Sequence, residues 1–113
     1  MTEFNYLDKV DFAATVCDSN GIVLYQNSRA IKRDGNVVGR SLYACHSDKS
    51  SAMIRTMMES GESNTYYVVR GGHRRLIHQT PWKKDEDTVA GLIELSIDLP
   101  GDIQTIDRDT KSL

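Results

Sequence analysis

The sequence predicts an α+β fold in which a five-stranded antiparallel sheet carries its helices on one face. Two turn dipeptides, Asn20-Gly21 and Gly71-Gly72, each lie between runs rich in β-branched and aromatic residues, which is typical of two-residue hairpins. An amphipathic segment between Asp48 and Gly61 lies between these hairpins and has the apolar spacing of a helix. The resulting order of two strands, a helix and three strands lacks the alternation of a parallel sheet.

Length and composition favour one small globular domain. The chain has 113 residues, of which 39% are hydrophobic and 27% charged, and its formal net charge is −2. These values exclude a coiled coil and wholesale disorder, and the near-balanced charge gives no reason to expect a nucleic-acid partner. No apolar run approaches the roughly 18 residues of a membrane span, and the start lacks the apolar segment of a signal peptide. We therefore expect a cytoplasmic protein without membrane contacts.

The first hairpin is expected to pair residues 12–18 with residues 22–26, because Asn-Gly readily adopts the positive φ of a tight turn. Residues 27–38 show no sustained apolar period and are interrupted by glycine. We predict a loose connector there, with at most short helical turns.

Ser47 and Asp48 precede the predicted helix and Gly61 ends it, since serine and aspartate are favoured N-caps and glycine is a favoured C-terminal cap. Within it, Met53 and Met57 recur four positions apart. The strands that follow are expected at 65–70, 73–82 and 89–97, with a polar turn at 85–88.

The two ends of the chain differ in their expected structure. Phe4, Leu7 and Val10 would line one side of a short flanking helix over residues 1–11. Residues 100–113 are poor in aliphatic side chains, and we predict a flexible tail there.

A series of turn and cap residues runs in order through residues 12–99. They are Asp18, Asn20, Gly21, Ile22 and Asn27, then Gly39-Arg40-Ser41-Leu42, then His46-Ser47-Asp48, and finally Pro81, Gly91, Ile97 and Asp98. Together they resemble a PAS domain, the small sensory fold found in bacterial kinases and regulators. The stretch 27–39 is short for that family, which places helical turns over its ligand cavity there, so a small or closed pocket is expected.

The hairpin turns fix which residues lie opposite one another and therefore which share a face. The Gly71-Gly72 turn pairs Arg70 with His73, and a four-residue loop at 85–88 would pair Lys84 with Val89. One face then carries Tyr66, Val68, Arg75, Ile77, Gln79, Leu92, Glu94 and Ser96. The other carries Tyr67, Val69, Leu76, His78, Trp82, Ile93, Leu95 and Ile97.

Apolarity alone would make the second face the core. The resemblance implies the opposite, because the PAS positions that match the first face look into the ligand cavity. We follow the resemblance, and the candidate ligand-binding residues are Thr15, Cys17, Tyr43, Met53, Met57, Ile77, Gln79, Glu94 and Ser96.

The inward polar residues need partners, because burying such groups without hydrogen bonds costs about 1–3 kcal/mol each. Two explanations stay open at this point. Gln79 and Glu94 could satisfy each other with the help of water, or a small polar ligand could satisfy them.

The second face forms an apolar patch too large for one short helix to cover, which predicts a homodimer. The candidate interface residues are Phe4, Leu7, Leu76, Trp82, Ile93, Leu95 and Ile97.

The sequence gives little support for a flavin, haem, metal or catalytic site. Flavin photochemistry of the LOV subfamily would need a cysteine where Leu42 stands, and Cys45 lies three positions late. Haem would need an axial ligand, for which His46 and His78 are the candidates. No recognised metal spacing and no nucleophile motif occurs, so we expect no metal, no catalytic residue and no enzyme activity.

The sequence therefore predicts a stand-alone sensory PAS module in signal transduction, binding a small polar ligand and needing no cofactor. The alternatives are a ligand-free dimerisation or protein-interaction module and, with less support, a haem or redox sensor. The expected partners are a second copy, an unidentified small molecule and a signalling protein.

Overall fold

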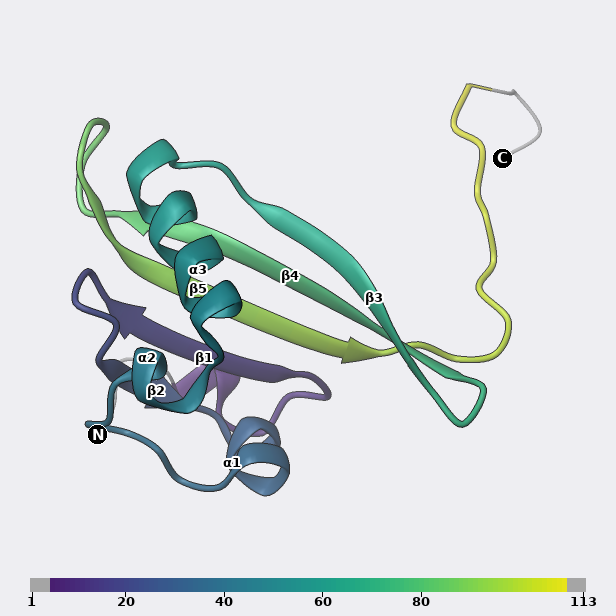
Figure 1. Ribbon diagram of the computed structural model, residues 1–113. Helices are drawn as coiled ribbons and strands as arrows, with labels where there is room; N and C mark the ends of the chain where they lie inside the picture. Colours follow the sequence, from purple (N-terminus) through teal and green to yellow (C-terminus); the bar gives the residue numbers. More distant parts are fainter. Residues whose placement is uncertain (1–4, 110–113) are drawn as a thin grey trace.

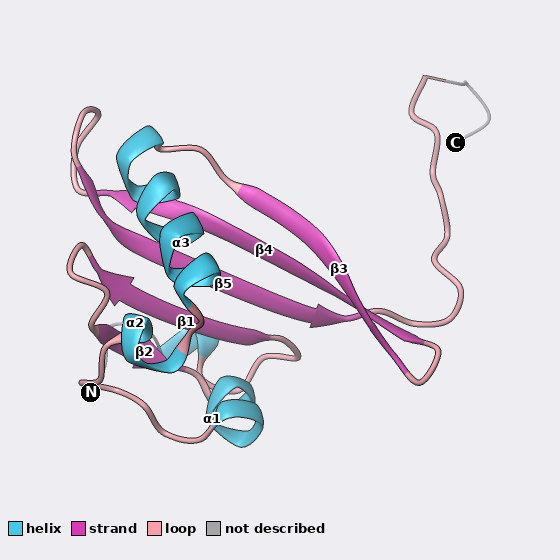
Figure 2. Cartoon of the chain, viewed as in Figure 1, coloured by secondary structure: helices cyan, strands magenta, loops and turns pink. Residues whose placement is uncertain are grey.

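The computed structural model describes residues 5–109, which form five strands, three helices and one 3-10 turn (Figures 1 and 2). The elements are η1 (Asn5–Leu7), β1 (Ala13–Asp18), β2 (Val23–Gln26), α1 (Ser28–Asp34), α2 (Leu42–Cys45), α3 (Asp48–Ser60), β3 (Asn64–Arg70), β4 (His73–Lys83) and β5 (Val89–Asp98). The strands form one antiparallel sheet in the order β2-β1-β5-β4-β3. The predicted α+β fold is confirmed.

The first hairpin closes through Asp18, whose Oδ1 accepts the backbone N–H groups of Asn20 and Ile22 at 2.9 and 3.0 Å. Gly21 has a φ of +79°, and a Cβ there would lie 2.6 Å from the ring of Tyr43. The turn thus needs glycine both for its backbone conformation and for the close approach of α2.

The loose connector predicted over 27–38 is wrong in its first half, where α1 forms. Asn27 caps this helix, its Oδ1 accepting the N–H groups of Ala30 and Ala14 at 3.0 Å each. Its Nδ2 donates to the carbonyls of Leu7 and Phe12. Because α1 buries only Ala30, its sequence carries no apolar period that could have predicted it.

The long helix α3 begins and ends where its caps predict. Ser47 accepts the N–H of Ser50, and Gly61 adopts the left-handed conformation while donating to the carbonyl of Met57. Ile54 and Met57 of α3 are buried in a core cluster that also holds Cys17 and Leu92 of the sheet.

The register of β3, β4 and β5 agrees with the sequence-based pairing over most of its length. Ile77 lies opposite Ser96 and Gln79 opposite Glu94. The predicted pairing of Lys84 with Val89 is wrong, because an irregularity after Trp82 shifts the register and pairs Lys83 with Val89.

The helices cover the face of the sheet that carries Ile77, Gln79, Leu92 and Ser96, all of which are buried. We call this the inner face and the opposite one the outer face. The inner face is the one that the resemblance indicated, and apolarity alone would have selected the wrong side.

The described residues before β1 and after β5 take no part in the sheet. Of the flanking helix expected over residues 1–11, the described part forms only the turn η1, and Phe4 lies outside the described residues. The carbonyls of Leu7 and Asp8 bond Asn27 and Ser28 rather than a following helical turn. Residues 100–109 form no helix or strand and run away from the sheet (Figure 1). No helix in the described part of the chain is long and apolar enough to cross a membrane.

Candidate functional site

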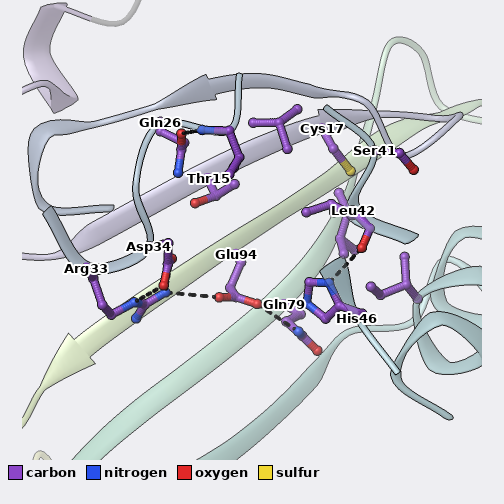
Figure 3. A pocket seen from close by; sticks show the side chains of 14 residues that line it. Thr15, Cys17, Gln26, Arg33, Asp34, Ser41, Leu42, His46, Gln79 and Glu94 are labelled. Atoms are coloured by element: carbon purple, nitrogen blue, oxygen red, sulfur yellow. Dashed lines mark hydrogen bonds and ion pairs between the residues drawn. The ribbon is translucent and has the colours of Figure 1, made fainter. Parts of the chain in front are cut away.

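A cavity of about 320 Å³ lies between the inner face of the sheet and the segment from β2 to α3 (Figure 3). Its apolar lining residues are Cys17, Val23, Val37, Leu42, Ile54 and Leu92. Its polar lining residues are Thr15, Gln26, Arg33, Asp34, Ser41, His46, Gln79 and Glu94. Its volume falls at the lower end of the range of small-molecule pockets, about 300–1,000 Å³.

Four of the residues that the sequence nominated line this cavity: Thr15, Cys17, Gln79 and Glu94. They come from the adjacent strands β1, β4 and β5, whose alternation brings them to the same face. Gln79 lies opposite Glu94 through the register of β4 and β5, and the pairing of β1 with β5 places Thr15 opposite Glu94.

The other five nominated residues lie around the cavity. Met57 and Ile77 are buried in the core and do not line it. Met53 is 46% exposed and lines an adjoining groove on the other side of Gln79 and Glu94. Ser96 borders a smaller neighbouring cavity, and Tyr43 packs under Gly21 with Arg55 over its ring.

The sequence reasoning missed the helix α1 and therefore the two charged residues at its end, Arg33 and Asp34. It also missed Gln26, whose Oε1 accepts the N–H of Val37 at 2.8 Å and whose Nε2 donates to Gly35 at 3.0 Å. Gln26 thereby holds the loop after α1 against the cavity. Only the folded chain brings these residues to the site, and no local motif marks them.

A hydrogen-bonded row forms the polar floor of the cavity. Gln79 Nε2 donates to Glu94 Oε2 at 2.9 Å, and Asn64 Nδ2 donates to Gln79 Oε1 at 3.4 Å. Asn64 thus orients the amide so that its donor faces the carboxylate. Gln79 and Glu94 therefore satisfy each other through one carboxylate oxygen, Oε2 of Glu94. The other oxygen, Oε1, takes no part in this bond.

Arg33 reaches from α1 to this floor. It donates to both carboxylate oxygens of Asp34, at 3.1 and 2.9 Å, and to the hydroxyl of Ser96. Its Nη2 lies 3.5 Å from Glu94 Oε1, an ion pair longer than an ordinary hydrogen bond. The guanidinium thereby joins α1 to β5 at one end of the cavity (Figure 3).

The two histidines considered for haem occupy different places. His46 lines the cavity, and its Nδ1 lies 2.8 Å from the carbonyl of Leu42. His78 lies on the outer face, 2.7 Å from the hydroxyl of Thr65. A haem macrocycle is large for a cavity of about 320 Å³, so the lining residues fit it poorly.

The Cys17 thiol faces the cavity and is 1% exposed. Burial raises its pKa to about 11, so the group stays a neutral thiol at physiological pH. Among the side chains that the structure describes, no group of three or more His, Cys, Asp or Glu could hold a metal ion.

The outer face carries the apolar patch that the sequence indicated. Its half-buried members are Leu76, Trp82, Ile93, Leu95 and Ile97. Trp82 lies over Gly91 and its Nε1 donates to the carbonyl of Cys17 at 2.9 Å, so this patch touches the main chain of a cavity residue.

No protein-family model matches the chain, and no curated protein matches it. Several solved structures, in contrast, are similar to it. The PAS domain of the histidine kinase ThkA superposes with a TM-score of 0.63 and 20% identity, covering 79% of this chain and 100% of that one. A sensory box sensor histidine kinase from Vibrio cholerae gives a TM-score of 0.67 at 13% identity, covering 84% and 87% of the two chains.

VqmA of Vibrio cholerae, a LuxR-type receptor, gives a TM-score of 0.69 at 19% identity. The match covers 88% of this chain and 52% of VqmA, so this chain spans about half the length of that protein. VqmA has been solved as a dimer, bound to DPO, and in a complex with ligand and DNA. Together these likenesses confirm the PAS-like fold that the sequence indicated.

Proposed function

We propose that this chain is a sensory module that binds a small ligand in the cavity beneath α1–α3 and acts in signal transduction. The observation that carries the proposal is a cavity with apolar walls and a polar floor made by Gln79 and Glu94. Such a lining excludes water from most of a ligand while fixing its orientation through few polar contacts.

The structural neighbours support this assignment by analogy of fold. Two of them are domains of sensor kinases, and VqmA binds DPO. Fold alone does not carry function, so the proposal depends on the cavity itself. We further propose residues 12–99 as the sensory unit, located in the cytoplasm, with binding rather than catalysis as its activity. The absence of a nucleic-acid partner stays a prediction, and VqmA gives a reason to test it.

The outer patch supports a homodimer as part of the same proposal. Leu95 and Ile97 lie at its centre on β5, flanked by Leu76 and Trp82 on β4. Apolar surface of this kind is commonly covered by another chain. The alternative, a ligand-free dimerisation module, is supported by this patch and by no other feature described above. It would also give the cavity no role.

Ligand binding is tested by screening a metabolite library with thermal shift and native mass spectrometry. The adjacent residues Val37 and Val38 provide a matched pair, because Val37 lines the cavity whereas Val38 is 48% exposed outside it. We expect Val37→Trp to fill the cavity and lose the ligands that the parent binds, and Val38→Trp to retain them. Absence of any hit for the parent would leave the ligand-free module as the function.

Dimerisation is tested by sedimentation velocity on Leu95→Arg and on Leu24→Arg, which places the same charge at a leucine of β2 that is 48% exposed. We expect the parent and Leu24→Arg to sediment as dimers and Leu95→Arg as a monomer. A parent protein that is monomeric at micromolar concentration contradicts the homodimer.

A further inference from the structure

We infer that the cavity selects a ligand whose nitrogen group donates N–H bonds, such as an amidine, amine or amino-heterocycle, and that it rejects carboxylates and phosphates. This inference rests on the proposed ligand-binding function and names the chemical class of the ligand. It follows from how the polar atoms of the floor are already bonded.

The charges at the cavity are one guanidinium and two carboxylates, from Arg33, Asp34 and Glu94. Arg33 is committed to its neighbours, since it donates twice to Asp34 and once to Ser96. The charge of this guanidinium is therefore already paired with Asp34, and an anionic ligand would also lie close to two carboxylates.

The two carboxylate oxygens of Glu94 differ in their contacts. Its Oε2 accepts from Gln79 at 2.9 Å, whereas the contact given for its Oε1 is the longer ion pair with Arg33 Nη2 at 3.5 Å. Glu94 is partly exposed, with 27% of its side chain accessible. Its Oε1 is thus a charged acceptor at the cavity, and bonds from N–H groups to such an acceptor are about twice as strong as neutral ones.

His46 supplies a second acceptor. The Leu42 carbonyl can only accept, so His46 Nδ1 is the donor of that contact. In the neutral ring Nε2 is then an acceptor, and the ring lies beside Gln79 and Glu94 in Figure 3. Two acceptors beside apolar walls favour a small, mainly apolar molecule with more than one N–H donor.

Three compounds of nearly equal size and shape test this inference: benzamidine, benzamide and benzoate. They differ in presenting a cation, a neutral amide or an anion on the same ring. We expect affinities measured by calorimetry or by amide chemical-shift titration to fall in that order. Benzamidine should bind about tenfold more tightly than benzamide, as one charge-assisted hydrogen bond implies, and benzoate should not bind.

The variant Glu94→Gln keeps the size of the side chain and an oxygen that can accept from Gln79, while removing the charge. We expect it to abolish the preference for benzamidine over benzamide. Glu86→Gln, in the exposed turn between β4 and β5, removes the same charge away from the cavity and should leave the preference unchanged.

Three results with these compounds overturn the inference: benzoate binding as tightly as benzamidine, no benzamidine binding at millimolar concentration, or an unchanged preference in Glu94→Gln. The proposed function is read separately, from library hits that Val37→Trp abolishes. Hits that are all anionic would refute the ligand class while leaving ligand binding intact.

Discussion

On the inner face of the sheet Gln79 and Ser96 are buried beneath the helices, whereas on the outer face Leu95 and Ile97 stay half-buried. The face with more polar residues is thus the better covered one. The difference teaches that composition does not decide which face of this sheet becomes the core. What decides is whether the polar groups of a face find partners once the helices cover it.

The inner face meets that condition through short chains of hydrogen bonds. Asn64, Gln79 and Glu94 form one such row, which the ion pair with Arg33 extends, and Ser96 bonds the same guanidinium. No buried side-chain nitrogen or oxygen within residues 5–109 lacks a partner. The covered face can therefore be polar at modest cost, and the apolar outer face is left available to another chain.

The largest expected effect comes from Gly91→Ala, which breaks the link between the two faces. A Cβ at Gly91 would lie 1.9 Å from the Cys17 carbonyl and 2.5 Å from Trp82 Nε1, so strand pairing and the indole contact must both shift. We expect a loss of about 3 kcal/mol or more in the free energy of unfolding, measured with urea. Gly101→Ala meets nothing within 4 Å and should change little. Equal stability of the two variants would contradict the close packing of Trp82.

A smaller effect is expected when the free energy of unfolding is measured at different pH values. This measurement tests whether the Cys17 thiol on the inner face is shielded from water. Burial raises the pKa of Cys17 from 9.0 to about 11. Folding therefore favours the protonated thiol, and the associated stability is complete below pH 9 and is lost as the pH rises towards 11. The loss should total about 2–3 kcal/mol.

The matched control for this prediction is Cys17→Ala, which removes the thiol. Tyr25, whose pKa is raised to about 12, contributes equally to both proteins and cancels in the comparison. Urea unfolding at several pH values should give curves that diverge above pH 9. Parallel curves would mean that the thiol is not desolvated in the folded protein.

The smallest effect is expected from Glu94→Leu, which makes the inner face more apolar. The change leaves the Gln79 amide without its acceptor and Arg33 without its ion pair, so we expect a loss of about 1–2 kcal/mol in a thermal or urea melt. Glu94→Gln keeps an acceptor and should lose less. An increase in stability for Glu94→Leu would show that composition, rather than partners, governs this face.

The sequence predicted the register of β3–β5 because two tight turns fix the pairing and a period of two then places each side chain. This is why Gln79 and Glu94 could be assigned to one site, to which the resemblance to PAS domains added Thr15 and Cys17. The irregularity between Trp82 and Lys83 was not predicted, because neither strand carries a local sequence marker for it.

By itself, the sequence determined the turns, the caps of α3 and the alternation of the strands, because these depend on contacts between neighbouring residues. Only the tertiary structure decided the rest of the site. Arg33 and Asp34 reach the cavity because Asn27 ties α1 to β1 and the N-terminal segment, which are remote in sequence. Likewise the two oxygens of Glu94 meet different partners, Gln79 and Arg33, only because α1 reaches β5 in the folded chain. A one-dimensional pattern cannot specify such partners, since they depend on how distant segments pack.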